Sequence, residues 1–212
     1  MLVLVSGLPG TGKTTVANQI AKDIDGVVLR TDAIRREIFK EASIEEIERS
    51  DDPYKYDLQG AFNKLKIIPE KYQRLIWRQN EKVYDVLFKR LQDYLKDKNV
   101  IIDATFYKRD LRDRAYDIAE ELNKEVILVL TECPEECVKS RIVKRKTTPD
   151  EYSHLDKIEV YDKIKNLFED PKLDGKPIFI YNTESQEIEE NNTTEEMEII
   201  RTSLEKLRLR YK

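Results

Sequence analysis

The sequence predicts an α/β fold in which a five-stranded parallel sheet is covered by helices on both faces. Five short apolar runs have the length of buried strands, and helical patterns lie between them. The expected strands are residues 2–6, 27–31, 99–105, 125–131 and 177–183. Apolar strands that alternate with helices are typical of a parallel sheet with helices on each side. We therefore expect ligands at the carboxyl ends of the strands.

The segments outside the strands predict helices, a helical insertion and a C-terminal extension. Residues 13–24 and 70–97 carry apolar side chains along one helical stripe each. Residues 41–69 mix short amphipathic pieces with turn signals, which predicts a helical insertion beside the ligand site. Residues 183–200 contain seven glutamates and no basic residue. We expect residues 184–212 to form an acidic, solvated connector and a C-terminal helix.

Composition indicates one charged globular domain. The 212 residues are 40% apolar and 38% charged, and no apolar run approaches the roughly 20 residues of a membrane span. The apolar start is too short for a signal peptide, so we expect a cytoplasmic location and no membrane partner. The net charge of −4 gives no global reason for nucleic-acid binding but leaves room for a local basic channel. Cys133 and Cys137 lack a second pair to complete a zinc site, which favours ordinary reduced thiols.

A phosphate-binding loop follows the first expected strand. The stretch GLPGTGKT matches the pattern G-x-x-x-x-G-K-[ST], with a strand before it and a helix after it. Glycines let backbone N–H groups converge on phosphate oxygens at the helix N-terminus, and Lys13 can reach the β- and γ-phosphates. The expected nucleotide-binding residues are Gly7, Leu8, Pro9, Gly10, Thr11, Gly12, Lys13, Thr14 and Thr15.

A magnesium site is expected beside this loop. Thr14 offers a hydroxyl, and Asp103 places a carboxylate at the end of the third strand. Ala104 follows, where many motor and ring ATPases have a glutamate that orients water. Guanine-nucleotide switches usually have Asp-x-x-Gly after this strand and Asn-Lys-x-Asp later, but here the strand ends in Asp-Ala-Thr-Phe and no Asn-Lys-x-Asp follows.

An acceptor site is expected after the second strand. Asp32 and Arg35 are three residues apart at a helix start, so their side chains face the same way. Asp32 could accept the proton of an attacking hydroxyl, and Arg35 could hold the acceptor or the transferring phosphoryl group. The alternative is that Asp32 caps the helix and Arg35 lies on a solvated face.

A basic lid is expected at about residues 139–150. Arg141 and Arg145 are four apart on one helix face, where they could neutralise a transferring phosphoryl group and exclude water. The alternative is that these charges only complement a helix C-terminus. After the last strand, Asn182 and Thr183 could contact the adenine base.

A third basic segment follows the metal-binding strand. Arg109, Arg112 and Arg114 alternate with aspartates. They could line an acceptor cleft, but a salt-bridged helix face is the expected structure.

Together these segments resemble the P-loop kinases grouped as "AAA domain" kinases, over about residues 1–183. This group is similar to polynucleotide kinase, zeta toxins, gluconate kinase and seryl-tRNA kinase. The resemblance implies a P-loop NTPase fold of the nucleoside- and nucleotide-kinase type. An Asp-x-x-Arg supplies the base and an acceptor-binding arginine in polynucleotide kinase, which corresponds to Asp32 and Arg35. Its lid carries Arg-x-x-x-Arg, which corresponds to Arg141 and Arg145.

The function expected from these patterns is ATP- and Mg²⁺-dependent transfer of the γ-phosphoryl group to a hydroxyl. The acceptor is either a polynucleotide or tRNA end or a small molecule. The alternative is an ATP-binding or ATP-hydrolysing regulatory protein that moves the insertion or the C-terminal helix against a partner. Ala104 counts against this alternative, whereas the acidic tail favours it.

Overall fold

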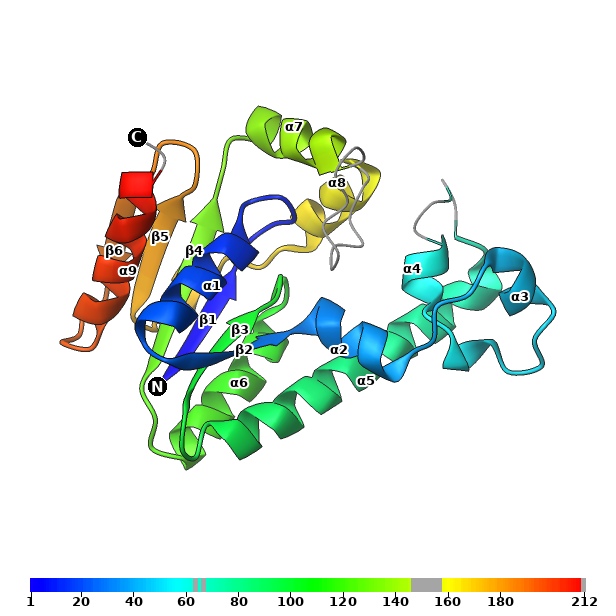
Figure 1. Cartoon of the computed structure of the whole chain (residues 1–212), viewed down its shortest axis with the longest axis horizontal. Coiled ribbons are helices and arrows are strands. Elements are labelled where there is room, and N and C mark those ends of the chain that lie inside the picture. The colour runs from blue at the N-terminus through cyan, green and yellow to red at the C-terminus, as the bar shows by residue number, and fades with distance from the viewer. Residues whose placement is uncertain (63–64, 66–67, 146–157, 211–212) are drawn as a thin grey trace.

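The computed structural model describes residues 1–62, 65, 68–145 and 158–210. These residues form one sheet with the strand order β2-β3-β1-β4-β5-β6 (Figure 1). The strands are β1 (Leu2–Ser6), β2 (Gly26–Arg30), β3 (Asn99–Asp103), β4 (Val126–Glu132), β5 (Ile178–Asn182) and β6 (Ile188–Asn191). The first five run parallel, as the sequence predicts, so their carboxyl ends share one edge.

The prediction of five strands is wrong by one strand. Within the described residues the sheet has six, because β6 pairs antiparallel with β5. It lies inside the acidic stretch that was expected to be a solvated connector. Ile188 is the only apolar residue of β6 and packs against the core beneath the sheet. A single apolar residue among glutamates shows no strand periodicity. The segment becomes a strand because its backbone forms hydrogen bonds with the free edge of β5.

Helices cover both faces of the sheet. On one face lie α1 (Lys13–Asp23) and the C-terminal α9 (Met197–Arg210), which pack against each other. On the other lie α5 (Glu70–Tyr94) and α6 (Arg109–Glu121) (Figure 1). Alternate residues of β1 divide between the two cores: Leu2 and Leu4 join the α5 side, and Val3 and Val5 join the α1 side. This division explains the continuous apolar run of a strand buried on both faces.

The segment between β2 and α5 projects beyond the sheet. It holds α2 (Thr31–Ile38), α3 (Ile44–Glu48), a short 3₁₀ turn (Pro53–Lys55) and α4 (Leu58–Phe62). Figure 1 shows α3, α4 and the first turns of α5 extending away from the strands. This part has its own apolar cluster, which consists of Ile47, Leu58, Phe62, Tyr72 and Ile76. Most of the cluster falls in the stretch 41–69, where the sequence predicts a helical insertion.

The buried side chain of Gln79, on α5, forms hydrogen bonds with the backbone of this projecting part. Its amide nitrogen donates to the carbonyls of Tyr54 and Tyr56, and its amide oxygen accepts from the N–H of Leu58. The buried amide is therefore hydrogen-bonded on both sides, as a polar group in a core needs to be.

Beyond β4 lie α7 (Glu135–Arg145), α8 (Ile158–Leu167) and a 3₁₀ turn (Pro171–Asp174).

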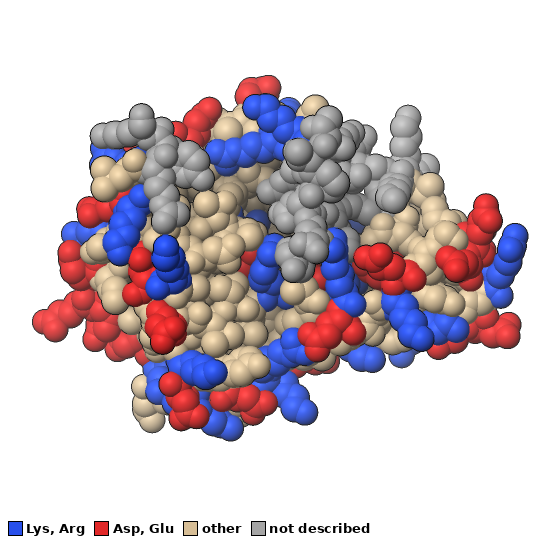
Figure 2. Space-filling view, viewed as in Figure 1, with Lys and Arg blue, Asp and Glu red and all other residues tan. Residues whose placement is uncertain are grey.

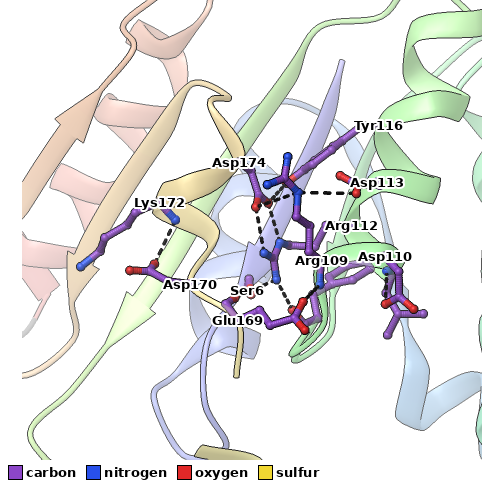
Figure 3. A network of polar contacts seen from close by, with 12 residues as sticks. Ser6, Arg109, Asp110, Arg112, Asp113, Tyr116, Glu169, Asp170, Lys172 and Asp174 are labelled. Carbon is purple, nitrogen blue, oxygen red and sulfur yellow. Dashed lines mark hydrogen bonds and ion pairs between the residues drawn. The ribbon is translucent and has the colours of Figure 1, made fainter. Parts of the chain in front are cut away.

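A buried polar network fixes this 3₁₀ turn to α6 (Figure 3). Arg112 is fully buried and binds Asp174 through two nitrogens, at 2.6 Å and 2.9 Å. Tyr116 donates to the same carboxylate at 2.7 Å. Arg112 is thus salt-bridged as expected, but it is a core residue whose partner lies on the 3₁₀ turn and not on its own helix. Arg109 and Arg114 do form exposed pairs with carboxylates, as expected.

The surface carries charges of both signs. Figure 2 shows Lys and Arg side chains interspersed with Asp and Glu across the face viewed. Among the described residues, no helix combines the length and the apolar character that a bilayer crossing requires.

Candidate nucleotide and phosphoryl-transfer site

The glycine loop between β1 and α1 adopts a conformation that requires glycine. Gly10 and Gly12 have φ values of 85° and 94°. A Cβ on Gly10 would lie 2.9 Å from Cγ1 of Val138, and one on Gly12 would lie 3.2 Å from Cγ2 of Thr183. The loop is therefore enclosed between α7 and the end of β5, and a larger residue at either position would strain it.

Polar contacts within the loop set its shape. The hydroxyl of Thr11 donates to the carbonyl of Leu8 at 2.7 Å and lies 2.7 Å from the hydroxyl of Thr131. The ammonium group of Lys13 donates to the same Leu8 carbonyl at 2.9 Å. Lys13 thus lies over the loop, where its charge can meet a phosphate.

The two expected metal ligands lie together. The hydroxyl of Thr14 donates to Oδ2 of Asp103 at 2.7 Å, which joins the first turn of α1 to the end of β3. Hydroxyl and carboxylate oxygens are the donors that Mg²⁺ takes from proteins, and the ion usually gains its remaining ligands from phosphates and water. The donor set therefore fits Mg²⁺.

Arg30 is a site residue that the sequence reasoning missed. Its Nε lies 3.2 Å from Oδ2 of Asp103, and its Nη2 donates to the Thr14 hydroxyl at 3.4 Å. Arg30 ends β2 and is in register with Asp103 at the end of β3. A charged residue at the end of an apolar strand indicates a place at the ligand-binding edge of the sheet. The contact of Arg30 with Asp103 could not be predicted, however, without knowing that β2 pairs with β3.

Asp32 and Arg35 both lie on α2, beside the carboxyl end of β2. The helix begins at Thr31 with Arg30 as its N-cap, so Asp32 lies within the first turn and is not the cap. Asp32 is half-buried. Its negative charge acts to raise the pKa of Arg35 and the pKa of Tyr84. The three groups therefore lie within electrostatic range of one another.

Arg35 is buried, contrary to the alternative of a solvated face. Only 4% of the residue is exposed, and Nη1 lies 3.7 Å from Oδ1 of Asp57 in the projecting part. Nη2 donates to the side-chain oxygen of Asn80 on α5. Burial lowers the pKa of Arg35, although Asp57 and Asp32 oppose this shift. Nη1 is buried and makes no hydrogen bond within the described residues, so the nearby carboxylate of Asp57 balances its charge.

Tyr84 of α5 adds a neutral group to this side of the site. Burial raises the pKa of its phenol well above the usual value, and the neighbouring Tyr107 and Asp32 raise it further. The phenol therefore remains protonated throughout the physiological range and can act only as a hydrogen-bonding group there.

Arg141 connects the expected lid to the loop. Its Nη1 donates to the hydroxyl of Thr183 at 2.7 Å and to the carbonyl of Gly10 at 3.4 Å. Thr183 in turn donates to the carbonyl of Thr11 at 2.8 Å. The backbone of Arg145 lies in the last turn of α7. The side chain of Arg145 and residues 146–150 of the expected lid lie outside the described residues.

A cavity of about 580 Å³ opens beside the loop. The residues that line it include Gly12, Thr15, Arg141, Lys144, Thr183 and Glu184. Thr183 lines this cavity, and its expected contact with adenine stays a prediction. The side-chain oxygen of Asn182 instead accepts the backbone N–H groups of Glu184 and Ser185, so it stabilises the turn after β5.

A pair of thiols lies near Arg141 and Thr183, which line the same cavity. Cys133 and Cys137 are free and partly buried. Burial raises the pKa of Cys133 to about 12, and a hydrogen bond with Cys137 contributes to the shift. A thiol with so high a pKa is protonated at neutral pH and is a weak nucleophile.

Comparison with known families agrees with this geometry. A family model described as "AAA domain" matches residues 2–171, which include the loop, Thr14, Asp103 and Arg141. The chain belongs to this family. It is a P-loop, kinase-like nucleotide-binding protein of that group.

Solved structures share its fold at low sequence identity. Chaetomium thermophilum Kti12, solved in complex with ADP-AlF₃, is 15% identical with a TM-score of 0.57, over 98% of this chain and 97% of that one. A gluconokinase from Sinorhizobium meliloti is 16% identical with a TM-score of 0.53, over 98% and 91%. A chain of the PezAT toxin-antitoxin system of Streptococcus pneumoniae is 18% identical with a TM-score of 0.53, over 100% and 85%.

Proposed function

We propose that this AAA domain protein is an ATP- and Mg²⁺-dependent phosphotransferase that moves the γ-phosphoryl group to a hydroxyl. One observation carries the proposal: Lys13, the Thr14–Asp103 pair and Arg141 surround a single glycine loop at the carboxyl edge of the sheet. Ala104 follows Asp103, so the glutamate that orients water in many hydrolytic relatives is missing. The site thus has cationic groups that can neutralise phosphate charge, but it has alanine where those proteins have the glutamate that activates water.

The donor phosphates would be held by this chain's loop. Residues Gly7–Thr15 present backbone N–H groups at the start of α1, and the helix dipole favours an anion there. Lys13 would exchange its contact with the Leu8 carbonyl for phosphate oxygens. Thr14 and Asp103 would hold Mg²⁺, which when bound neutralises charge on the phosphates.

Asp32 would act as the general base. It is half-buried near the metal-binding edge, and a carboxylate that accepts the proton of an attacking hydroxyl contributes about 10²- to 10⁴-fold in rate. Arg35 would place its positive charge on the side of the site where the acceptor binds. The contacts of Arg35 with Asp57 and Asn80 would keep α2 in place while it does so.

Arg141 would stabilise the transferring group. It already contacts Gly10 of the glycine loop and Thr183, so its guanidinium lies on the side of the loop where it could turn toward a bound phosphoryl group. Fixed positive charge in a site that excludes water stabilises developing negative charge strongly. Arg145 is assigned the same role on the sequence pattern.

A direct test is transfer from γ-labelled ATP to a panel of acceptors. The panel contains 5′-hydroxyl oligonucleotides, tRNA and small alcohols such as nucleosides and sugars. We expect label on one class of acceptor with the unmodified chain and Mg²⁺, and none with Lys13→Ala. Label that appears equally with Lys13→Ala would refute the assignment of the donor site. The class that is labelled distinguishes a nucleic-acid end from a small molecule.

A second candidate is an ATP-driven regulatory protein that moves its projecting part. The buried contact between Arg35 and Asp57 favours it, because this contact links the helix that carries Asp32 to the insertion. This candidate predicts ATP hydrolysis without any labelled acceptor. It also predicts that ATP changes the protease sensitivity of residues 41–69 in the unmodified chain but not in Lys13→Ala.

A further inference from the structure

Two sulfurs and a carboxylate converge beside the nucleotide cavity. Cys133 follows β4, Cys137 lies in the first turn of α7, and Glu184 lies in the turn between β5 and β6. One ligand atom from each residue, two Sγ atoms and a carboxylate oxygen, lies within 4.8 Å of the other two. The three residues come from two segments about 50 positions apart, so the fold itself assembles the group.

The ligand atoms lie within about 1 Å of the spacing that a tetrahedral metal ion needs. Two sulfurs that are each about 2.3 Å from zinc lie about 3.8 Å apart, and a carboxylate oxygen lies slightly closer. Movement of a side chain by about 1 Å brings the observed group to that geometry. Glu184 is exposed and lies on a turn, so its carboxylate can make this movement.

The donor set selects a particular kind of ion. Thiolates are soft ligands that favour zinc and related transition metals over Mg²⁺, whose site at Thr14 and Asp103 is built of oxygen alone. Three protein ligands leave one tetrahedral position for water or an external ligand. The group thus differs from the magnesium site in place and in chemistry.

We propose that Cys133, Cys137 and Glu184 form a binding site for a thiophilic divalent cation of the zinc type. The ion would join the start of α7 to the turn after β5. These two segments form walls of the nucleotide cavity, which Arg141 and Glu184 line. Arg141 and Thr183 already connect the same segments to the glycine loop. Metal binding would therefore stiffen the cavity wall without contributing a ligand to the phosphates.

Binding of Co²⁺ alone, without nucleotide, tests the site. The full chain is reduced with a phosphine, freed of metal with a chelator and titrated with Co²⁺, and absorption is recorded in the near ultraviolet and visible. We expect one Co²⁺ per chain with thiolate-to-cobalt charge-transfer absorption, and removal of this absorption by Zn²⁺. Co²⁺ at the Thr14–Asp103 site has only oxygen ligands and gives no such band.

Three variants decide the ligands. Cys137→Ser is expected to remove most of the charge-transfer absorption, and Glu184→Gln to weaken Co²⁺ binding at least about tenfold. The matched control Glu187→Gln lies in the same turn and is expected to bind as the unmodified chain does. Circular dichroism establishes that each variant is folded. Absence of the band in the folded, reduced chain would overturn the proposal, and so would equal binding by Glu184→Gln and Glu187→Gln. Because no ATP is present, failure here leaves the proposed phosphotransferase untouched.

Discussion

Arg30 and Asp103 end two neighbouring parallel strands in register, and Nε of the first lies 3.2 Å from Oδ2 of the second. The Asp103 side chain is only 5% exposed, so the guanidinium compensates a carboxylate that is largely removed from water. The same carboxylate oxygen accepts the hydroxyl of Thr14. A protein cation thus lies beside the two oxygens proposed to hold Mg²⁺.

Replacing Arg30 by methionine should therefore destabilise the metal-free protein more than the metal-bound protein. Without Mg²⁺, we expect Arg30→Met to lower the free energy of unfolding by about 1–3 kcal/mol, because Asp103 loses a charged partner. Saturating Mg²⁺ with nucleotide should restore more stability to the variant than to the unmodified chain. Thermal unfolding with and without Mg²⁺ measures both. Equal gains in the two proteins would show that Arg30 and the metal do not share Asp103.

Replacing Arg141 by alanine should slow phosphoryl transfer far more than it weakens ATP binding. The guanidinium is proposed to meet charge that develops in the transition state, so its loss should lower kcat by about 10²-fold or more. Steady-state kinetics and ATP titration measure the two effects. Arg49→Ala, at the exposed C-terminal cap of α3, serves as the control. A change confined to ATP affinity would contradict the transition-state role.

Replacing Arg112 by leucine should destabilise the fold without altering the site chemistry. Asp174 would remain buried without its charged partner, at a cost of about 3–5 kcal/mol. Urea unfolding checks this value. The double variant Arg112→Leu with Asp174→Leu should recover part of the loss, because neither charge is then left alone. As a control, Lys96→Ala removes an exposed pair and should change the stability by less than about 1 kcal/mol.

The contact between α7 and α8 should weaken in acid. Lys139 and Lys165 lower the pKa of the Glu135 carboxyl from 4.5 to about 2. A carboxylate whose pKa is lower in the folded state contributes stability that is complete above the unfolded value. This contribution should be lost as the pH falls from about 4.5 to about 2. Carboxyl NMR titration of Glu135, compared with Lys165→Ala, measures the shift. A midpoint near 4.5 in the unmodified chain would contradict the bridge.

The sequence predicts the parallel strands well because each is a buried apolar run next to a helical pattern. The expected range 2–6 matches β1, and the expected helices 13–24 and 70–97 correspond to α1 and α5 with small shifts at their ends. Strand β6 was missed because Ile188 is its only apolar residue, so pairing with β5 creates the strand.

The site was less predictable because its partners come from distant segments. The glycine loop is local, and its string identifies it. By contrast, the contacts of Arg30 with Asp103 and of Arg35 with Asp57 depend on how strands and helices pair in space. The approach of Glu184 to the two cysteines depends on the β5–β6 turn, which no local pattern predicts.

The most direct test of the central claim is the fate of the γ-phosphoryl group when Asp32 is replaced by asparagine. With an identified acceptor, we expect Asp32→Asn to slow transfer by about 10²- to 10⁴-fold while ATP affinity stays nearly unchanged, because only the proton acceptor is lost. If instead no acceptor is labelled, and ATP is hydrolysed equally well with and without Asp32, the protein is not the phosphotransferase proposed here.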